Sequence, residues 1–167
     1  MGNYMKLEIE LIPETCFYSN LRKSTIQKNW DIIRKQCYKD ANYKCEICGS
    51  DGKNQIFETR GSIDGSLNCH EIWEYDDVNH IQKLRGFIAL CNDCHMIKHI
   101  GFAQIQESKG LLDMNALIKH FLKINNVEIS DYEKHYTQSW KIQEERSKHV
   151  WKTEFGEWSH LIKKEKI

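Results

Sequence analysis

The N-terminal part of the chain alternates between charged and apolar side chains. Residues 6–12 read KLEIELI and are followed by Pro13. A period of two is typical of a half-buried strand, because successive side chains of a strand point to opposite faces of the sheet. Proline has no backbone N–H to pair with a neighbouring strand, so Pro13 is expected to end this strand and to place it at a sheet edge.

Two later segments have apolar side chains at the spacing of an amphipathic helix. The first is predicted to begin at Ser24, as its N-cap, and to run toward Ala41. The second covers residues 113–125. In both segments the apolar residues recur three or four positions apart, so that one side of the helix can be buried. These apolar residues are Ile26, Trp30, Ile33 and Cys37 in the first and Met114, Leu117, Ile118, Phe121 and Leu122 in the second.

A third helix is predicted in the C-terminal part of the chain. The residues SDYE fit a capping box that begins at Ser130. Aromatic residues follow at helical spacing, which favours packing in the core over stacking on nucleic-acid bases. We expect this helix to continue toward Trp151 and to end near Gly156. The aromatic residues are Tyr132, Tyr136 and Trp140.

The middle of the chain has the pattern of short strands separated by turns. Asp-Gly pairs, which favour tight turns, begin at Asp51 and Asp64. After the strands, residues 92–100 have a helical pattern, and Gly101 is placed to end that helix. The predicted strands are residues 55–59, 67–75 and 86–90.

The composition favours one ordered domain over all 167 residues. The chain has one Pro, nine Gly and 40% apolar residues, and it contains no low-complexity tract. Residues 45–99 hold the cysteine and histidine motifs and are predicted to form the core of the domain. A strand and a helix are expected before them, over residues 1–44, and a helical region after them, over residues 100–167.

The chain lacks the sequence features of secreted and membrane proteins. Its start shows no basic segment followed by an apolar run, and no segment approaches about 18 consecutive apolar residues. We therefore expect a cytoplasmic protein with no membrane partner. The 24 basic residues balance the 24 acidic residues, so contact with phosphate would need a local basic patch or a bound cation.

Four of the seven cysteines form two C-x2-C knuckles. The pairs are Cys45 with Cys48 and Cys91 with Cys94. Cysteines seldom form structural disulfides in a reducing compartment, and this spacing lets two thiolates reach one tetrahedral ion. The sequence therefore predicts a structural Zn2+ site with four cysteine ligands.

A second group of candidate ligands includes residues on both sides of the last knuckle. His95 and His99 are four residues apart, so on a helix both imidazoles lie on one face and can bind one divalent cation. Upstream, Cys69, His70 and Glu71 fall on a predicted strand. In an extended chain Cys69 and Glu71 point to one face and His70 to the other, so Glu71 could supply an oxygen ligand that Cys69 does not.

The order of these motifs resembles that of the HNH endonuclease family. The shared features are a C-x2-C pair, a histidine at the end of a strand, and a strand that runs into the motif L-C-x2-C-H-x3-H, all within residues 45–99. The resemblance implies an α+β protein with a zinc-stabilised, treble-clef-like ββα-metal centre. In this chain the centre would be flanked by N- and C-terminal helices.

The resemblance also implies roles for the site residues. His70 would be the general base that activates water, and His95 and His99 would bind a second divalent cation: Mg2+, Mn2+, Ni2+ or Zn2+. Cys69 and Glu71 are the candidates for a further ligand of this cation. The implied activity is hydrolysis of phosphodiester bonds, and the implied partner is nucleic acid in the form of double-stranded DNA.

Two positions depart from the family pattern. Gly86 stands where the family has an asparagine, and Cys69 stands where it has aspartate or histidine. These departures support an alternative function, a non-catalytic zinc-dependent module that binds nucleic acid or protein on a degenerate HNH scaffold. The side chains that could replace the missing carboxamide are Asn79, Gln82 and Asn92.

Basic residues before the first knuckle are candidates for contacts with nucleic acid. If they flank the metal cleft, they could follow a phosphate backbone, whereas otherwise they keep the surface soluble. These residues are Arg34, Lys35, Lys39 and Lys44.

Overall fold

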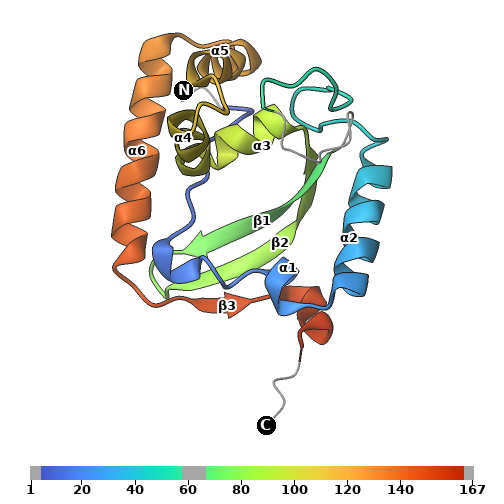
Figure 1. The fold of residues 1–167 in the computed structure, drawn as a ribbon. Coiled ribbons are helices and arrows are strands. Elements are labelled where there is room, and N and C mark those ends of the chain that lie inside the picture. The colour runs from blue at the N-terminus through green and yellow to red at the C-terminus, as the bar shows by residue number, and fades with distance from the viewer. Residues whose placement is uncertain (1–4, 58–66, 164–167) are drawn as a thin grey trace.

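A long antiparallel hairpin lies at the centre of the fold in the computed structural model, which describes residues 5–57 and 67–163 (Figure 1). The strands of the hairpin are β1 (Asn68–Asp76) and β2 (Ile81–Leu90). The short strand β3 (Lys152–Glu154) pairs in parallel with the start of β2. The protein is therefore a mixed α+β structure with a three-stranded sheet in the order β1-β2-β3.

Both strands of the hairpin agree in place with the sequence pattern. The strand predicted over residues 67–75 is confirmed by β1. The strand predicted at GFIAL is the second half of β2, which begins earlier, at Ile81. Apolar periodicity does not reveal the first half, because the polar Gln82 is buried there. Its side-chain amide donates to the Ser19 carbonyl and the Thr153 hydroxyl.

The hairpin contains a β-bulge next to Gly86. Ile72 of β1 pairs with Gly86, whereas the next residue of β1 pairs with Leu84. Arg85 is therefore the extra residue of the bulge on β2. The φ angle of Gly86 is 153°, which residues with a side chain rarely adopt. The position where the HNH pattern has an asparagine thus requires glycine in this chain.

Replacement of Gly86 tests this requirement. We expect Gly86→Asn to lower the free energy of unfolding by about 1 to 3 kcal/mol, because asparagine would be strained at this φ angle. Urea unfolding followed by circular dichroism measures the change, with Arg85→Asn at the neighbouring exposed position as the control. Equal stability of Gly86→Asn and the parent would show that the bulge accepts a side chain.

Helices cover both faces of the hairpin (Figure 1). α1 (Leu21–Ser24) and α2 (Gln27–Asp40) precede it in sequence, and Trp30 of α2 packs edge-on against Phe87 of β2 with ring centroids 6.0 Å apart. α3 (Asn92–Lys98) follows β2 directly and packs against the other face.

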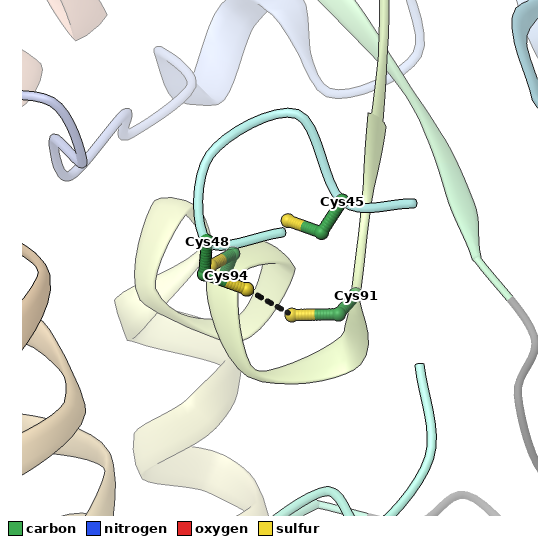
Figure 2. A group of neighbouring side chains, drawn as sticks. All are labelled: Cys45, Cys48, Cys91 and Cys94. Atoms are coloured by element: carbon green, nitrogen blue, oxygen red, sulfur yellow. Dashed lines mark hydrogen bonds between the residues drawn. The ribbon is translucent and has the colours of Figure 1, made fainter. Parts of the chain in front are cut away.

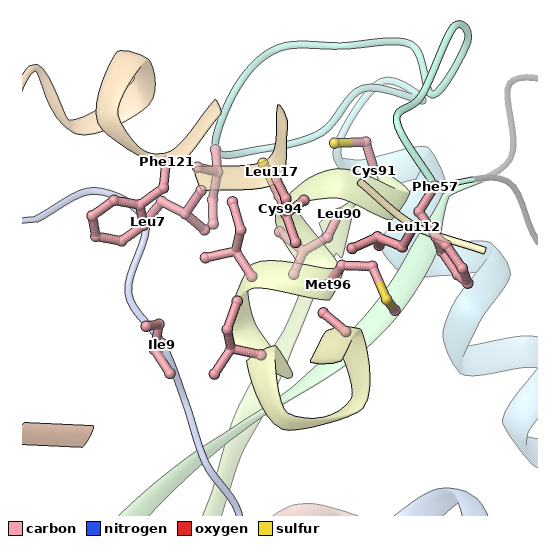
Figure 3. Close-up of a cluster of buried hydrophobic side chains, with 14 of the residues drawn as sticks. Leu7, Ile9, Phe57, Leu90, Cys91, Cys94, Met96, Leu112, Leu117 and Phe121 are labelled. Carbon is pink, nitrogen blue, oxygen red and sulfur yellow. The ribbon is translucent and has the colours of Figure 1, made fainter. Parts of the chain in front are cut away.

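Three further helices enclose the main core, and the first two of them pack against α3. They are α4 (Ile100–Ser108), α5 (Met114–Asn125) and α6 (Ile129–Ser147), and α5 confirms the helix predicted over residues 113–125. Each fully buried aliphatic or aromatic side chain contributes about 1.5 to 3 kcal/mol of burial free energy. The fully buried residues of this core include Ile97. Figure 3 shows others of them: Leu7, Leu90, Leu117 and Phe121.

The N-terminal segment is extended, but the strand predicted over residues 6–12 is wrong. Leu7 and Ile9 are buried, as the alternation indicates. Their backbone N–H groups donate to side chains instead of to a neighbouring strand. The acceptors are Asn125 Oδ1, 2.9 Å from the Leu7 nitrogen, and His135 Nε2, 2.8 Å from the Ile9 nitrogen. Helix side chains therefore take the place of a partner strand.

The helix predicted from Ser24 is divided into two helices. Asn20, and not Ser24, caps the short helix α1, with its side chain accepting the Lys23 N–H. Thr25 lies buried between α1 and α2, where its hydroxyl donates to the Leu161 carbonyl at 2.8 Å. This contact with the C-terminal part of the chain explains a break that local periodicity does not reveal.

Gly101 lies inside α4 and does not end a helix as predicted. The break is at His99, whose φ and ψ angles are −102° and 50°. A Cβ atom at position 101 would lie 3.4 Å from the ring of Trp140. α4 and α6 therefore pack against each other at this position.

The C-terminal helix also begins and ends differently from the prediction. Its capping box is formed by Glu128 and Asp131, and α6 ends at Ser147. Trp151 lies beyond it, with its indole N–H donating to the Arg146 carbonyl at 2.8 Å. The chain then forms β3 and the 3-10 helix η2 (Gly156–Leu161).

Two predictions in the middle of the chain fall partly or wholly outside the described residues. Residues 55–57 are not in a strand, and the rest of the predicted strand 55–59 and the turn at Asp64 lie outside the described ranges.

Before α1, the 3-10 helix η1 (Glu14–Cys16) follows Pro13. Among the helices of residues 5–57 and 67–163, none is both long and apolar enough to cross a bilayer.

Candidate metal and catalytic centre

The four knuckle cysteines converge on one point between three elements (Figure 2). Cys45 and Cys48 lie in the loop after α2, Cys91 follows β2, and Cys94 is in the first turn of α3. Their four sulfur atoms lie within 4.8 Å of one another, and the sulfurs of Cys48 and Cys91 are 3.6 Å apart. Zn–S bonds of about 2.3 Å place the sulfurs of a tetrahedral site roughly 3.8 Å apart. The group is therefore positioned to hold a metal ion and is consistent with structural zinc.

Backbone hydrogen bonds shape the first knuckle. The Gly49 N–H donates to the Cys45 carbonyl at 2.8 Å, and Gly49 has a φ angle of 77°, which a tight turn at this position requires. Glu46 joins the knuckle to β2, because its N–H and its carboxylate bond to the carbonyl and the N–H of Ala89. The knuckle is thus held in place by contacts other than those of its thiols.

The charge balance of the four thiols favours a bound cation. Hydrogen bonds to the sulfurs of Cys45 and Cys48 raise the pKa of Cys91 and that of Cys94 well above the usual range. Four thiolates cannot ionise together in a buried site without a compensating positive charge. A divalent ion supplies that charge, and thiolates are ligands that select zinc.

His120 is a site residue that the sequence does not reveal. Its Nε2 lies 3.3 Å from the sulfur of Cys94, and it comes from α5. Groups that hydrogen-bond to metal ligands orient them and tune their basicity. The distance of His120 from the two cysteine pairs along the sequence is not one typical of zinc ligands. The packing of α5 on α3 brings it to Cys94.

Three histidines form a second group on the other side of α3. His70 comes from β1, while His95 is in α3 and His99 is at its C-terminal end. One nitrogen of each lies within 4.8 Å of the others, which is close enough for one metal ion. The ring centroid of His70 is 5.5 Å from that of His95 and 5.0 Å from that of His99. The predicted pairing of His95 and His99 on one face agrees with this geometry.

Glu10 is the residue of this group that sequence reasoning missed. Its Oε2 lies 2.9 Å from Nε2 of His70, and its other carboxylate oxygen pairs with the ammonium of Lys98. The Glu10 N–H also donates to the Lys98 carbonyl at 2.9 Å. Glu10 and His70 are 60 positions apart in sequence, and no spacing rule connects them.

Burial and neighbouring charges set the protonation states of His95, His99 and Glu10 near neutral pH. Burial lowers the pKa of His95 well below its usual range and lowers the pKa of His99 to about 4. Burial alone would raise the pKa of Glu10, but the hydrogen bond from His70 and the charge of Lys98 outweigh it and lower that pKa to about 2. The two helix histidines are therefore neutral and able to bind metal, and Glu10 is ionised.

The structure does not bring Cys69 and Glu71 to the histidine group. The carboxylate of Glu71 accepts hydrogen bonds from the backbone N–H groups of Leu21 and Arg22 at the start of α1. The thiol of Cys69 neighbours that of Cys37 in α2, whose hydrogen bond raises the Cys69 pKa far above the usual range. Both residues therefore point away from α3, because side chains alternate along β1. Their expected role as ligands beside His95 and His99 does not agree with this placement.

Of the three carboxamides considered as replacements for the asparagine, only Asn92 joins the hairpin to α3. Its Oδ1 accepts a hydrogen bond from Asn68 Nδ2 at 2.8 Å, two residues before His70. Gln82 bonds to Ser19 and Thr153, as described above, and the Nδ2 of Asn79 donates to Asp76. Asn92 thus supports the strand that carries His70.

The predicted nucleic-acid contacts are not beside the histidine group. Arg34 pairs with Asp31 at 2.7 Å within α2. The helix α2 packs against the face of the hairpin that carries Cys69 and Phe87, whereas His70 faces α3. Lys35 and Lys39 are in this same helix, and Lys44 follows it.

One short helix thus contributes to both groups. Cys94 points to the other knuckle cysteines, and His95 and His99 point to His70. The carboxylate of Asp93, between Cys91 and Cys94, accepts hydrogen bonds from the N–H groups of Ile56 and Phe57 and fixes the start of α3.

Comparisons of the chain with protein-family models, with curated proteins and with solved structures find no match.

Proposed function

We propose that the protein is a metal-dependent endonuclease of the HNH type that hydrolyses phosphodiester bonds of double-stranded DNA. The observation that supports this function is the meeting of His70 from β1 with His95 and His99 of α3. A four-cysteine group lies beside them on the same helix. Nicking of plasmid DNA, with and without divalent cation, tests the proposal.

Each group has its own metal in this proposal. The four cysteines hold a structural Zn2+, and His95 and His99 hold a second divalent cation. When bound, the second cation supplies positive charge that stabilises the charge developing on the phosphate and on the leaving oxygen. Because imidazole is a borderline ligand, Mn2+, Ni2+ or Zn2+ suits this pair at least as well as Mg2+.

His70 acts as the general base. An ionised carboxylate only accepts hydrogen bonds, so the Nε2 of His70 carries a proton and donates a hydrogen bond to Glu10. This leaves Nδ1 as the nitrogen that takes a proton from the water attacking the phosphate. Glu10 fixes the tautomer and stabilises the imidazolium that forms, and Lys98 holds Glu10 in position.

Replacement of Glu10 tests its role as a positioning residue. We expect Glu10→Gln to lower the cleavage rate about 10- to 100-fold, because the amide keeps the shape of the carboxylate but loses its charge. Plasmid nicking kinetics measure the change, and thermal unfolding reports any loss of fold. Glu8→Gln, an exposed carboxylate in the same segment, is the control. Equal rates for Glu10→Gln and the parent would mean that Glu10 only anchors the N-terminal segment.

A further inference from the structure

A pocket of about 370 Å³ opens directly beside the histidine group. His99 and Glu10 form part of its wall, so the pocket and the histidine group share two residues. The rest of the wall comes from the N-terminal segment, α4 and α6. The apolar residues of the wall are Leu11, Ile12, Phe17, Phe102, Ile105 and Trp140.

The pocket is built for a flat apolar group and not for a phosphate. Its wall contains no lysine or arginine, and its two carboxylates, of Glu10 and Glu14, repel anions. Phe17 and Phe102 are about half exposed, at 48% and 47%, so their surfaces are open to a ligand. A phosphate would therefore stay with the cation at the histidine group, while the uncharged part of the same ligand enters the pocket.

Trp140 contributes part of its aromatic ring to this wall. Its indole nitrogen is buried inside the protein. A ligand in the pocket therefore contacts the ring of Trp140 and not its N–H group.

We propose that this pocket takes one nucleobase of the cleaved strand, next to the phosphate at the histidine group. The inference rests on the proposed nuclease function and adds a subsite to it. Every nucleobase has a flat π face that can stack on the half-exposed rings of Phe17 and Phe102. The volume is at the small end of ligand pockets, about 300 to 1,000 Å³, and suits one base with its sugar. A base enters such a pocket only after leaving the duplex stack.

The binding of single-stranded DNA tests the subsite without cleavage, in a chelator dose that removes the second cation and leaves the structural zinc in place. Two chains of equal length and charge are compared by fluorescence anisotropy, one with bases and one of abasic sites. We expect the parent protein to bind the base-bearing chain roughly 5- to 100-fold more tightly, the usual worth of stacking one base. Phe102→Ala should remove most of this preference, and Phe17→Ala, at the other half-exposed ring of the wall, should reduce it. Ile32→Ala, at an exposed apolar position of α2, should leave it unchanged.

The outcomes separate the subsite from the nuclease. Equal affinity of the parent for both chains, together with metal-dependent nicking of plasmid, overturns the subsite and leaves the nuclease standing. A preference that survives both Phe102→Ala and Phe17→Ala also overturns it. Self-association of the parent that Phe102→Ala abolishes would show that a second copy of the chain covers the pocket. Absence of both DNA binding and nicking overturns the subsite together with the nuclease.

Discussion

Cys48→Ser is expected to abolish folding or to lower the free energy of unfolding by about 4 kcal/mol or more. The four sulfurs join the loop after α2, the end of β2 and the start of α3. Serine is a poor zinc ligand, so the substitution removes a bond of the metal and leaves three thiols packed around an unbalanced site. Because a structural zinc site binds its ion only when folded, loss of the ion is loss of folding free energy.

Zinc content and stability together measure this effect. Elemental analysis of the purified parent should give one tightly bound zinc per chain, and Cys48→Ser should give none. Cys37→Ser, a half-buried thiol outside the four-cysteine group, is the matched control and should keep the metal. If chelator yields a metal-free parent protein whose melting temperature equals that of the untreated protein, a structural metal is ruled out.

His70→Ala is expected to lower the cleavage rate about 10²- to 10⁴-fold, the usual contribution of a general base. The alanine variant should keep the fold, the zinc and the affinity for DNA. It removes the imidazole of β1 that lies beside both His95 and His99. His160→Ala, at an exposed histidine far along the chain in η2, is the control.

Binding of Mn2+ to the histidine group distinguishes a base from a ligand. Isothermal titration of the zinc-loaded protein measures this binding without DNA. If His70 is the base, His70→Ala binds Mn2+ nearly as well as the parent while cleavage is lost. If His70→Ala cleaves as fast as the parent, His70 is structural, and either another residue is the base or the binding-module alternative replaces the nuclease.

The sequence predicts the four-cysteine group better than the rest of the site. Two C-x2-C pairs are a short-range signal, and the spacing of His95 and His99 follows from the helix repeat. The meeting of His70 with them was implied by the resemblance to HNH endonucleases, and the positions of the three rings agree with it. Glu10 could not be predicted, because its contact depends on where the N-terminal segment crosses α3.

The errors in the predicted fold also arise because local sequence pattern does not reveal tertiary contacts. The alternation at Leu7 and Ile9 correctly marks which side chains are buried, but it does not reveal that Asn125 and His135 replace a partner strand. Glycine statistics place a helix end at Gly101, whereas that residue lies inside α4 and packs against Trp140 of α6. Local pattern thus predicts burial, and tertiary contacts decide hydrogen-bond partners and helix ends.

Nicking of supercoiled plasmid by the zinc-loaded protein is the most direct test of the proposed nuclease. The account predicts conversion to open-circular DNA when Mn2+, Ni2+ or Mg2+ is added. It also predicts no conversion in a chelator dose that leaves the structural zinc in place, and none above background for His70→Ala. Equal nicking in chelator and in added metal, or no nicking by the parent with any of these cations, would contradict the account.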